Sequence, residues 1–237
     1  MSVRLLELED VHAGYKSTPV LRGVNMHVEA GEVVALLGAN GAGKTTTLKT
    51  ISGILPVTAG TLTVVGEPVR KGRPWLVARR GVAHVPEDRG LFFQLTVREN
   101  LTLGARHGSA DLDRIFSYFP ALKGLMKRRA GLLSGGEQQM LATARAIVSG
   151  AKLIMVDEMS LGLAPILVER LLPVLRQIAQ DSKAGVLLVE QHIELALNIA
   201  DRGYVLSRGA VQKTDTAKAL LNDRHLLEAN YLGEIIR

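Results

Sequence analysis

One eight-residue segment, GANGAGKT at residues 38–45, constrains this chain more than any other part of it. It follows a continuous apolar run at 33–37 and precedes a helix-like segment at 46–51, so the local order is strand, glycine-rich turn and helix. The spacing G-x-x-x-x-G-K-T is that of a phosphate-binding loop. Its glycines let the backbone adopt positive φ, and the amide groups of such a turn point at phosphate oxygens. The alternative is a chance glycine turn; the strand and helix beside it favour nucleotide binding.

Two side chains of this segment carry its chemistry. Lys44 supplies positive charge for the outer phosphates of a nucleotide, and the hydroxyl of Thr45 is a ligand for Mg²⁺. The other residues expected to contact the nucleotide are Gly38, Ala39, Asn40, Gly41, Ala42, Gly43 and Thr46.

Composition narrows the class of protein. With 237 residues, 47% of them hydrophobic, the chain can form one large α/β domain, and no apolar run approaches the roughly 20 residues that span a bilayer. The absence of cysteine favours a reducing cytoplasm, and the first ten residues lack the apolar segment of a signal peptide. The net charge is +6, but the basic residues are scattered and aromatic residues make up only 4%. We therefore expect a solvated basic surface with phosphate-binding groups, and no nucleic-acid partner.

Two kinds of strand pattern occur along the chain. Residues 3–11 and 20–28 alternate apolar and polar side chains, which predicts half-exposed antiparallel strands with Tyr15 in the turn between them. Continuous apolar strands alternate with helices elsewhere, which predicts a mostly parallel sheet with helices on both faces. Further strands are expected at 33–37, 61–65, 81–85, 153–156, 185–189, 204–206 and 211–213, and helices at 164–180, 193–200 and from 216 onward. Pro173 is expected to kink the 164–180 helix or to start its second half.

The middle of the chain, about 91–150, reads as a helical lobe inserted into the α/β core of a single domain spanning 1–237. A capping box, Thr96 to Glu99, begins a helix that reaches residue 103. A loop at 104–109 and short helices at 111–119 and 122–128 follow.

Two acidic residues, Asp157 and Glu158, come directly after the 153–156 strand. The carboxyl end of a buried strand is where α/β folds place their ligands. Asp157 suits coordination of Mg²⁺, and Glu158 suits polarising a water molecule for attack on a γ-phosphate. The alternative is that the two acids simply end a strand in solvent. The phosphate-binding loop earlier in the chain favours the functional interpretation instead.

A second glycine-containing turn, LSGGEQ at 133–138, precedes an apolar helix. Ser134 and Glu137 form a simple capping box, but a cap does not require Gly135 and Gly136, which lower helix propensity. Adjacent glycines at a helix start expose amide groups to an anion. The turn and the phosphate-binding loop lie in different lobes, so a two-fold pair of chains would bring each turn onto its partner's loop.

In order and spacing, GANGAGKT, LSGGEQ and LIMVDE resemble the nucleotide-binding subunit of an ATP-binding cassette (ABC) transporter over essentially the whole chain. The resemblance implies a P-loop NTPase fold with a RecA-like, mostly parallel core, N-terminal antiparallel strands and the helical lobe. It also implies two ATP molecules, with Mg²⁺, held between two chains, and coupling to membrane subunits. By this resemblance, Tyr15 matches the aromatic residue that stacks on adenine. Ser134, Gly135 and Gly136 match the residues that contact the γ-phosphate on the partner chain, and Glu137 lies beside them. Asp157 matches the carboxylate that binds Mg²⁺, and Glu158 matches the catalytic carboxylate.

Three positions depart from the common family pattern. Glu87 stands where a Gln usually contacts Mg²⁺ and the membrane subunits. Gln191 stands where a His usually contacts the γ-phosphate, and His192 comes one residue later, so either of the two can serve. Leu163 stands where the loop after Glu158 usually carries Asp. These departures leave ATP binding intact and the rate of hydrolysis open.

Together the departures resemble one branch of the family, the ATPases of importers for branched-chain (hydrophobic) amino acids. VPEDRGLF, DEMSLGLAP, VEQH, ADRGYVL and Tyr231-Leu-Gly233 carry this resemblance, with Met159 in place of the usual Pro. It implies a peripheral subunit on the cytoplasmic face of the membrane, transmembrane permease subunits, a solute-binding protein, and a second ATPase chain that is identical or different. The alternatives are an ABC ATPase for another small solute, an ABC protein outside transport, and a hydrolysis-deficient binding module.

Overall fold

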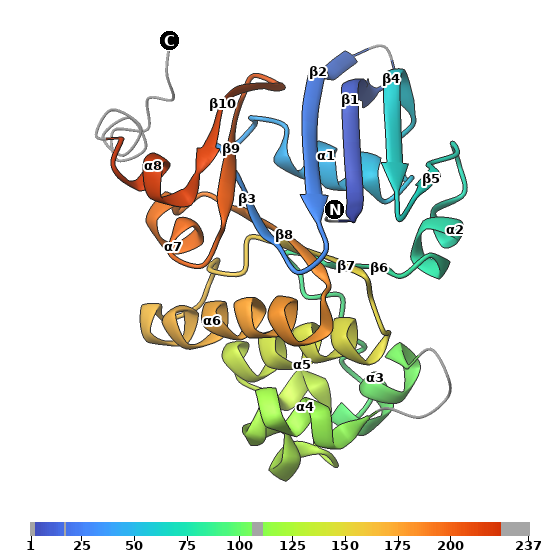
Figure 1. Ribbon diagram of the computed structural model, residues 1–237. Coiled ribbons are helices and arrows are strands. Elements are labelled where there is room, and N and C mark those ends of the chain that lie inside the picture. The colour runs from blue at the N-terminus through green and yellow to red at the C-terminus, as the bar shows by residue number, and fades with distance from the viewer. Residues whose placement is uncertain (1–2, 17, 106–110, 224–237) are drawn as a thin grey trace.

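Two β-sheets, with helices between and below them, make up the part of the chain that the computed structural model describes, residues 3–16, 18–105 and 111–223 (Figure 1). The six-stranded sheet has the order β10-β9-β3-β8-β7-β6; β10 runs antiparallel to β9 and the other neighbours are parallel. Its strands are β3 (Val33–Leu37), β6 (Val82–Val85), β7 (Leu153–Asp157), β8 (Gly185–Glu190), β9 (Arg202–Ser207) and β10 (Ala210–Thr216). The four-stranded antiparallel sheet, in the order β2-β1-β4-β5, comprises β1 (Arg4–Tyr15), β2 (Thr18–Glu29), β4 (Val57–Val64) and β5 (Glu67–Pro68).

The core lies on both faces of the six-stranded sheet. Every residue of β3, β7 and β8 is buried, so their side chains alternate between two apolar clusters. Val34 and Leu36 join the cluster that holds the four-stranded sheet and α1 (Lys44–Ile51). Ala35 and Leu37 join the cluster on the opposite face, which is covered by helices. The predicted mostly parallel core with antiparallel N-terminal strands is confirmed.

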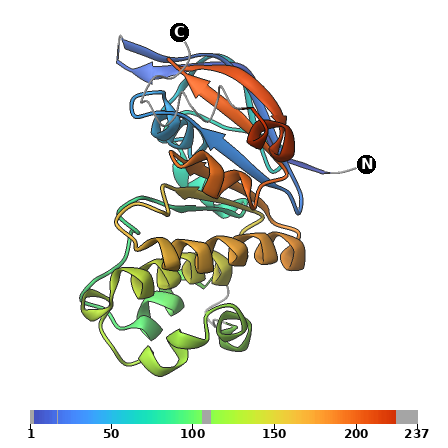
Figure 2. The same cartoon turned by 90° about the vertical axis from the view of Figure 1, so that its left-hand side faces the viewer.

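Helices occupy the face away from the four-stranded sheet. They are α3 (Val97–Gly104), α4 (Leu112–Tyr118), α5 (Gly135–Val148) and α6 (Pro165–Ser182), with 3₁₀ helices η1 (Pro120–Leu125) and η2 (Ala130–Leu132). Both ribbon views show α6 below the sheet, and α3, α4 and α5 grouped beneath it (Figures 1 and 2). Three short helices complete the fold: α2 (Pro74–Arg79), α7 (Ile193–Leu197) and α8 (Ala217–Leu221). Within the described ranges, no helix is long and apolar enough to cross a membrane.

Several local predictions were wrong. Tyr15 is the last residue of β1 rather than part of a turn, because β1 and β2 pair as far as Tyr15 opposite Thr18. The short helix expected at 122–128 has other bounds: it is the 3₁₀ helix η1, which starts at Pro120 and ends at Leu125, and it contains Gly124, which is poorly suited to a regular α-helix. Of the two outcomes expected at Pro173, a separate second helix is excluded, because helix α6 continues through this residue as a single element; the kink stays a prediction. Most of the 104–109 loop and the segment 231–233 lie outside the described residues.

Candidate nucleotide-binding site

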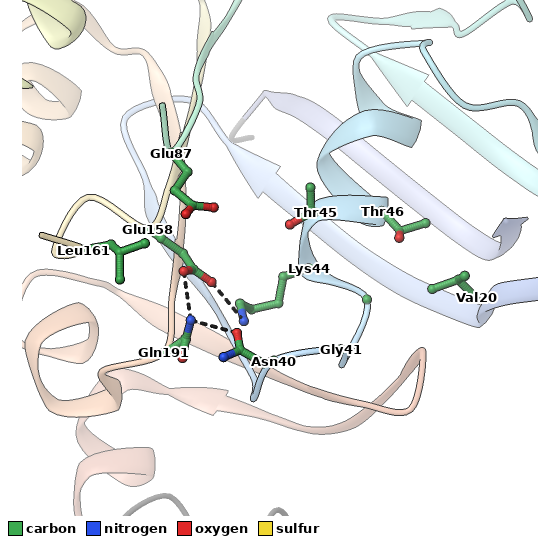
Figure 3. Close-up of a pocket in the computed structure, with 11 residues that line it drawn as sticks. Val20, Asn40, Gly41, Lys44, Thr45, Thr46, Glu87, Glu158, Leu161 and Gln191 are labelled. Carbon is green, nitrogen blue, oxygen red and sulfur yellow. Dashed lines mark hydrogen bonds and ion pairs between the residues drawn. The ribbon is translucent and has the colours of Figure 1, made fainter. Parts of the chain in front are cut away.

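A cavity of about 490 Å³ lies at the carboxyl edge of the six-stranded sheet. Because β3, β6, β7 and β8 are parallel, the loops that follow them meet at this edge. These loops bring together residues that are far apart in the sequence, as Figure 3 shows. The residues lining the cavity are Val20, Asn40, Gly41, Gly43, Lys44, Thr45, Thr46, Glu87, Glu158, Leu161 and Gln191.

The phosphate-binding loop joins β3 to α1 as the sequence predicts. Gly43 precedes the helix with φ of 113°, which L side chains rarely adopt, and a Cβ atom at Gly38 would lie 2.5 Å from the carbonyl oxygen of Leu206. No side chain caps α1 and its first turn holds no acidic residue. The start of the helix therefore keeps its attraction for an anion.

The ammonium group of Lys44 is buried between the loop and a carboxylate. Its Nζ atom donates to the carbonyl oxygens of Gly38 at 2.8 Å and Ala39 at 3.1 Å, and it forms an ion pair with Glu158 Oε1 at 3.2 Å (Figure 3). Only 4% of the Lys44 side chain is exposed, so its charge needs these partners. The predicted phosphate-binding cation and the predicted catalytic carboxylate thus lie in direct contact.

Gln191, from the end of β8, holds the other oxygen of the same carboxylate. Its Nε2 atom donates to Glu158 Oε2 at 2.8 Å and to Asn40 Oδ1 at 2.9 Å (Figure 3). His192 is exposed at the N-cap of α7 and does not line the cavity. Of the two residues considered for contact with the γ-phosphate, the structure therefore places Gln191 in the cavity.

Asp157 lies at the end of β7, one residue before Glu158. It is 5% exposed, and its Oδ1 atom is buried without a hydrogen-bond partner among the described residues. Burial, followed by the charges of Glu158 and Glu87, raises the pKa of Asp157 to about 6. A divalent cation relieves both the missing partner and the repulsion between carboxylates, so the residues present fit Mg²⁺.

The geometry also fits the way in which Mg²⁺ is usually held. Thr45 and Glu87 line the same cavity beside Glu158. The described ranges contain no group of three or more His, Asp or Glu side chains arranged to hold a metal ion by themselves. Mg²⁺ in nucleotide sites takes one or two protein oxygens and completes its shell with phosphates and water.

Replacing Asp157 with asparagine is expected to stabilise the nucleotide-free chain at pH 8 by about 1–3 kcal/mol. The folded pKa, about 6, lies above the unfolded value, so the wild-type chain loses stability as the pH rises from about 4 to about 6. Asparagine is neutral throughout, and its advantage should therefore shrink toward pH 4. Urea unfolding at pH 4.5 and pH 8 measures this difference, with the exposed Asp113→Asn as control. An equal effect of Asp157→Asn at both pH values would contradict a buried charge.

The LSGGEQ turn begins α5 and forms the predicted capping box. Ser134 Oγ accepts from the amide of Glu137 at 3.4 Å, and Glu137 Oε2 accepts from the amide of Ser134 at 2.7 Å. Gly135 and Gly136 follow as the first helical residues. None of these four residues lines the cavity. One chain therefore does not bring the two predicted phosphate-binding turns together.

Arg89 links the Glu87 loop to this turn, a contact that the sequence did not reveal. Its Nη1 atom donates to Gln138 Oε1 at 2.7 Å, and its Nη2 atom lies 3.5 Å from where a Cβ atom at Gly135 would be. Arg89 reaches this place from a backbone with φ of 67°. Its partners lie almost fifty residues away in the sequence, so no local pattern indicates them.

Tyr15, the predicted adenine contact, lies on the β1–β2 hairpin and is 43% exposed. Lys49 Nζ lies 5.8 Å from the centre of its ring. Tyr15 does not line the cavity, whereas Val20 on the facing strand does. The sequence interpretation missed Val20 and Leu161, because single apolar residues give no signal that separates a cavity wall from a core.

Comparison with known proteins decides the family. The sequence profile of the ABC transporter family matches residues 21–160, which is more than half of the chain. The chain belongs to the ABC transporter family. It is an ABC-type ATPase, a class that binds ATP and ADP.

Relatives of this ABC ATPase align along nearly its whole length. It is 40% identical over 234 residues to the high-affinity branched-chain amino acid transport ATP-binding protein BraG of Pseudomonas aeruginosa, covering 97% of this chain and 100% of the relative. It is 36% identical to the probable branched-chain amino acid transport ATP-binding protein LivF of Archaeoglobus fulgidus, covering 92% and 94% of the two chains. An ATP-binding cassette of an ABC transporter, solved in its ADP conformation, superposes with a TM-score of 0.84 at 25% identity, covering 98% and 100%. The resemblance seen in the sequence, to the branched-chain importer branch, is confirmed at the level of homology.

Proposed function

We propose that this ABC ATPase powers the uptake of a branched-chain or other hydrophobic amino acid through separate transmembrane permease subunits, fed by a solute-binding protein. The observation that carries the proposal is the 40% identity to a branched-chain amino acid transport ATPase over that relative's full length. Glu87 and Gln191, which depart from the common family pattern, support the same branch, and both side chains line the cavity. We place the chain on the cytoplasmic face of the membrane as a peripheral subunit.

The residues in and around the cavity have separate roles in ATP hydrolysis. Lys44 and the amide groups at the start of α1 hold the phosphates, and Tyr15 stacks on the adenine. Thr45, Asp157 and Glu87 would hold Mg²⁺, which neutralises phosphate charge when bound. Glu158 orients the attacking water and accepts its proton. Before ATP arrives, Lys44 is paired with Glu158; an entering phosphate takes over Lys44 and frees this carboxylate for water.

The site is completed by a second ATPase chain. Ser134, Gly135, Gly136 and Glu137 lie at the start of α5, away from the cavity, so within one chain no ATP would contact both. A head-to-tail pair places each LSGGEQ turn on the partner's γ-phosphate, with Gln191 on the other side of that phosphate. ATP then bridges the interface between the two chains, and its hydrolysis allows them to dissociate.

A groove beside the Glu87 loop is the proposed contact for the permease. It has a volume of about 340 Å³ and lies between β6, the loop after it and α5. Nitrogen atoms of three side chains around it, His84 Nε2, Arg89 Nε and Arg145 Nε, are buried without partners among the described residues. Because Arg89 contacts Gln138 of the LSGGEQ turn, a movement of the permease in this groove would be transmitted to that turn. The helical lobe at 91–150 would then move together with the permease.

The proposal is tested by the mass of Glu158→Gln in solution, measured by light scattering with and without Mg·ATP. This variant keeps an oxygen and the neighbouring Gln191 contact but lacks the base, so it should bind ATP without splitting it. We expect the mass to double only with Mg·ATP, while the wild-type chain hydrolyses ATP and returns to the monomer. A variant that binds ATP without doubling would instead require a different partner ATPase. Failure to bind ATP would overturn the proposal.

A further inference from the structure

Glu190 is a buried carboxylate next to the nucleotide cavity but outside it. It is the last residue of β8, 1% exposed, and does not line the cavity. Both of its oxygens are occupied by one residue: Oε1 accepts from the Ser160 amide at 2.9 Å, and Oε2 accepts from Ser160 Oγ at 2.7 Å. Ser160 belongs to the loop that follows Glu158.

This carboxylate is costly for the fold. The residues before it in β8 are apolar and fully buried, and another apolar side chain there would avoid desolvating an acid. Burial raises the pKa of Glu190, while the two hydrogen bonds from Ser160 lower it. Within the described part of the chain, this buried carboxylate accepts hydrogen bonds only from one loop residue, which points to a function in that loop.

The backbone of Glu158, in the same loop, is in a strained conformation. Its φ is +44°, a left-handed conformation that is unfavourable for a residue with a side chain and persists only where its surroundings fix it. Its amide donates to the carbonyl oxygen of Val189 at 2.9 Å. Glu158 and Ser160 are thus tied to the consecutive β8 residues Val189 and Glu190.

We propose that Glu190 is a positioning residue for ATP hydrolysis. By accepting two hydrogen bonds from Ser160, Glu190 keeps Glu158 in the left-handed conformation that directs the Glu158 carboxylate into the cavity. The next residue, Gln191, then holds that carboxylate itself, through Nε2 at 2.8 Å from Oε2. The end of β8 therefore fixes the backbone, the following turn and the side chain of one catalytic residue. This inference rests on the proposed function, since it concerns the role of Glu158 in hydrolysis.

Kinetics of Glu190→Ala test the inference. We expect kcat to fall about 10–100-fold, because a displacement of about 1 Å at a reacting group has this effect. The Kd for Mg·ATP should stay within about twofold, since Glu190 does not line the cavity. Glu190→Gln still offers an oxygen to the Ser160 amide and an NH₂ group to its hydroxyl, and should restore most of the activity. Glu169→Ala, an exposed glutamate of α6, is the matched control and should behave as wild type.

Ser160→Ala keeps the backbone bond and loses the hydroxyl bond, so we expect a several-fold smaller effect than that of Glu190→Ala. The double variant should be no slower than Glu190→Ala alone, because both changes act through one contact. Hydrogen exchange of the Ser160 amide should be faster in Glu190→Ala, while the amides of β8 stay protected. If Glu190→Ala does not fold, Glu190→Gln and Ser160→Ala carry the comparison.

The outcomes separate this inference from the proposed function. If the wild-type chain hydrolyses ATP and Glu158→Gln does not, the proposed function stands, and an unchanged kcat in Glu190→Ala overturns only the inference. A parallel loss of ATP affinity and kcat would also overturn it, as this indicates general damage to the site. A wild-type chain that binds ATP but never hydrolyses it, even when paired with a different partner ATPase, would overturn both.

Discussion

Lys44→Ala is expected to weaken ATP binding about 10²–10³-fold and to abolish measurable hydrolysis. Among the residues that line the described cavity, Lys44 alone carries a positive charge. Its Nζ atom donates hydrogen bonds to two loop carbonyls and lies 3.2 Å from Glu158 Oε1. A bound phosphate would replace these partners as the acceptor of the Lys44 hydrogen bonds. Each charge-assisted hydrogen bond contributes about 1.5–3 kcal/mol, so losing two of them weakens binding by about 10²–10⁴-fold, and the expected loss lies in the lower part of this range.

Isothermal titration with ATP, and separately with ADP, measures this loss. Lys152→Ala removes an exposed lysine far from the cavity and should bind both nucleotides as the wild type does. Lys44→Ala should still fold, because Glu158 keeps its hydrogen bond from Gln191; a thermal unfolding scan checks this. Near-normal affinity in a folded Lys44→Ala chain would mean that the amide groups at the start of α1 bind phosphate without the cation.

The sequence predicts best the parts of this fold whose signals are local. The order strand, glycine turn and helix at 33–51 is confirmed as β3, the loop and α1 because apolar continuity, positive φ and the helix start act within twenty residues. The capping boxes at Thr96 and Ser134 are confirmed for the same reason. Pro173 shows the limit of such reasoning. Alone it predicts a kink or the start of a second helix, but α6 stays one element because it buries Leu171, Leu172 and Leu175 on the core, and this packing outweighs one missing amide.

The contacts that assemble the site could not be predicted in this way. Glu190 and Ser160 lie thirty residues apart and meet only because β7 and β8 pair in register. Gln191 and Asn40 lie still further apart along the chain. A local pattern shows Glu190 as the end of an apolar strand and cannot show that its carboxylate turns toward a neighbouring loop. Long-range register, rather than composition or periodicity, sets these distances.

Mixing two inactive chains is expected to restore ATP hydrolysis. Gly135→Asp places a carboxylate where the LSGGEQ turn would meet the partner's phosphate, so this variant should bind ATP through its own intact loop but should not hydrolyse it. Lys44→Ala has the opposite defect, an intact LSGGEQ turn and a damaged loop. In a mixed pair, one site combines the sound loop of the first chain with the sound turn of the second.

Random pairing of equal amounts makes half of the dimers mixed, each with one sound site of two, so roughly a quarter of wild-type activity should return. Two controls fix the interpretation. Gly135→Ala adds no charge and meets only Leu163 and Arg89 at 3.4 and 3.5 Å, so it should remain largely active. A chain carrying both Lys44→Ala and Gly135→Asp should rescue neither single variant. If the mixture stays inactive although both chains fold, the LSGGEQ turn does not complete a site on another copy of this chain, and the partner is a different ATPase. Recovery in the mixture alone means that each ATP is held by two chains, because neither chain then contains a complete site.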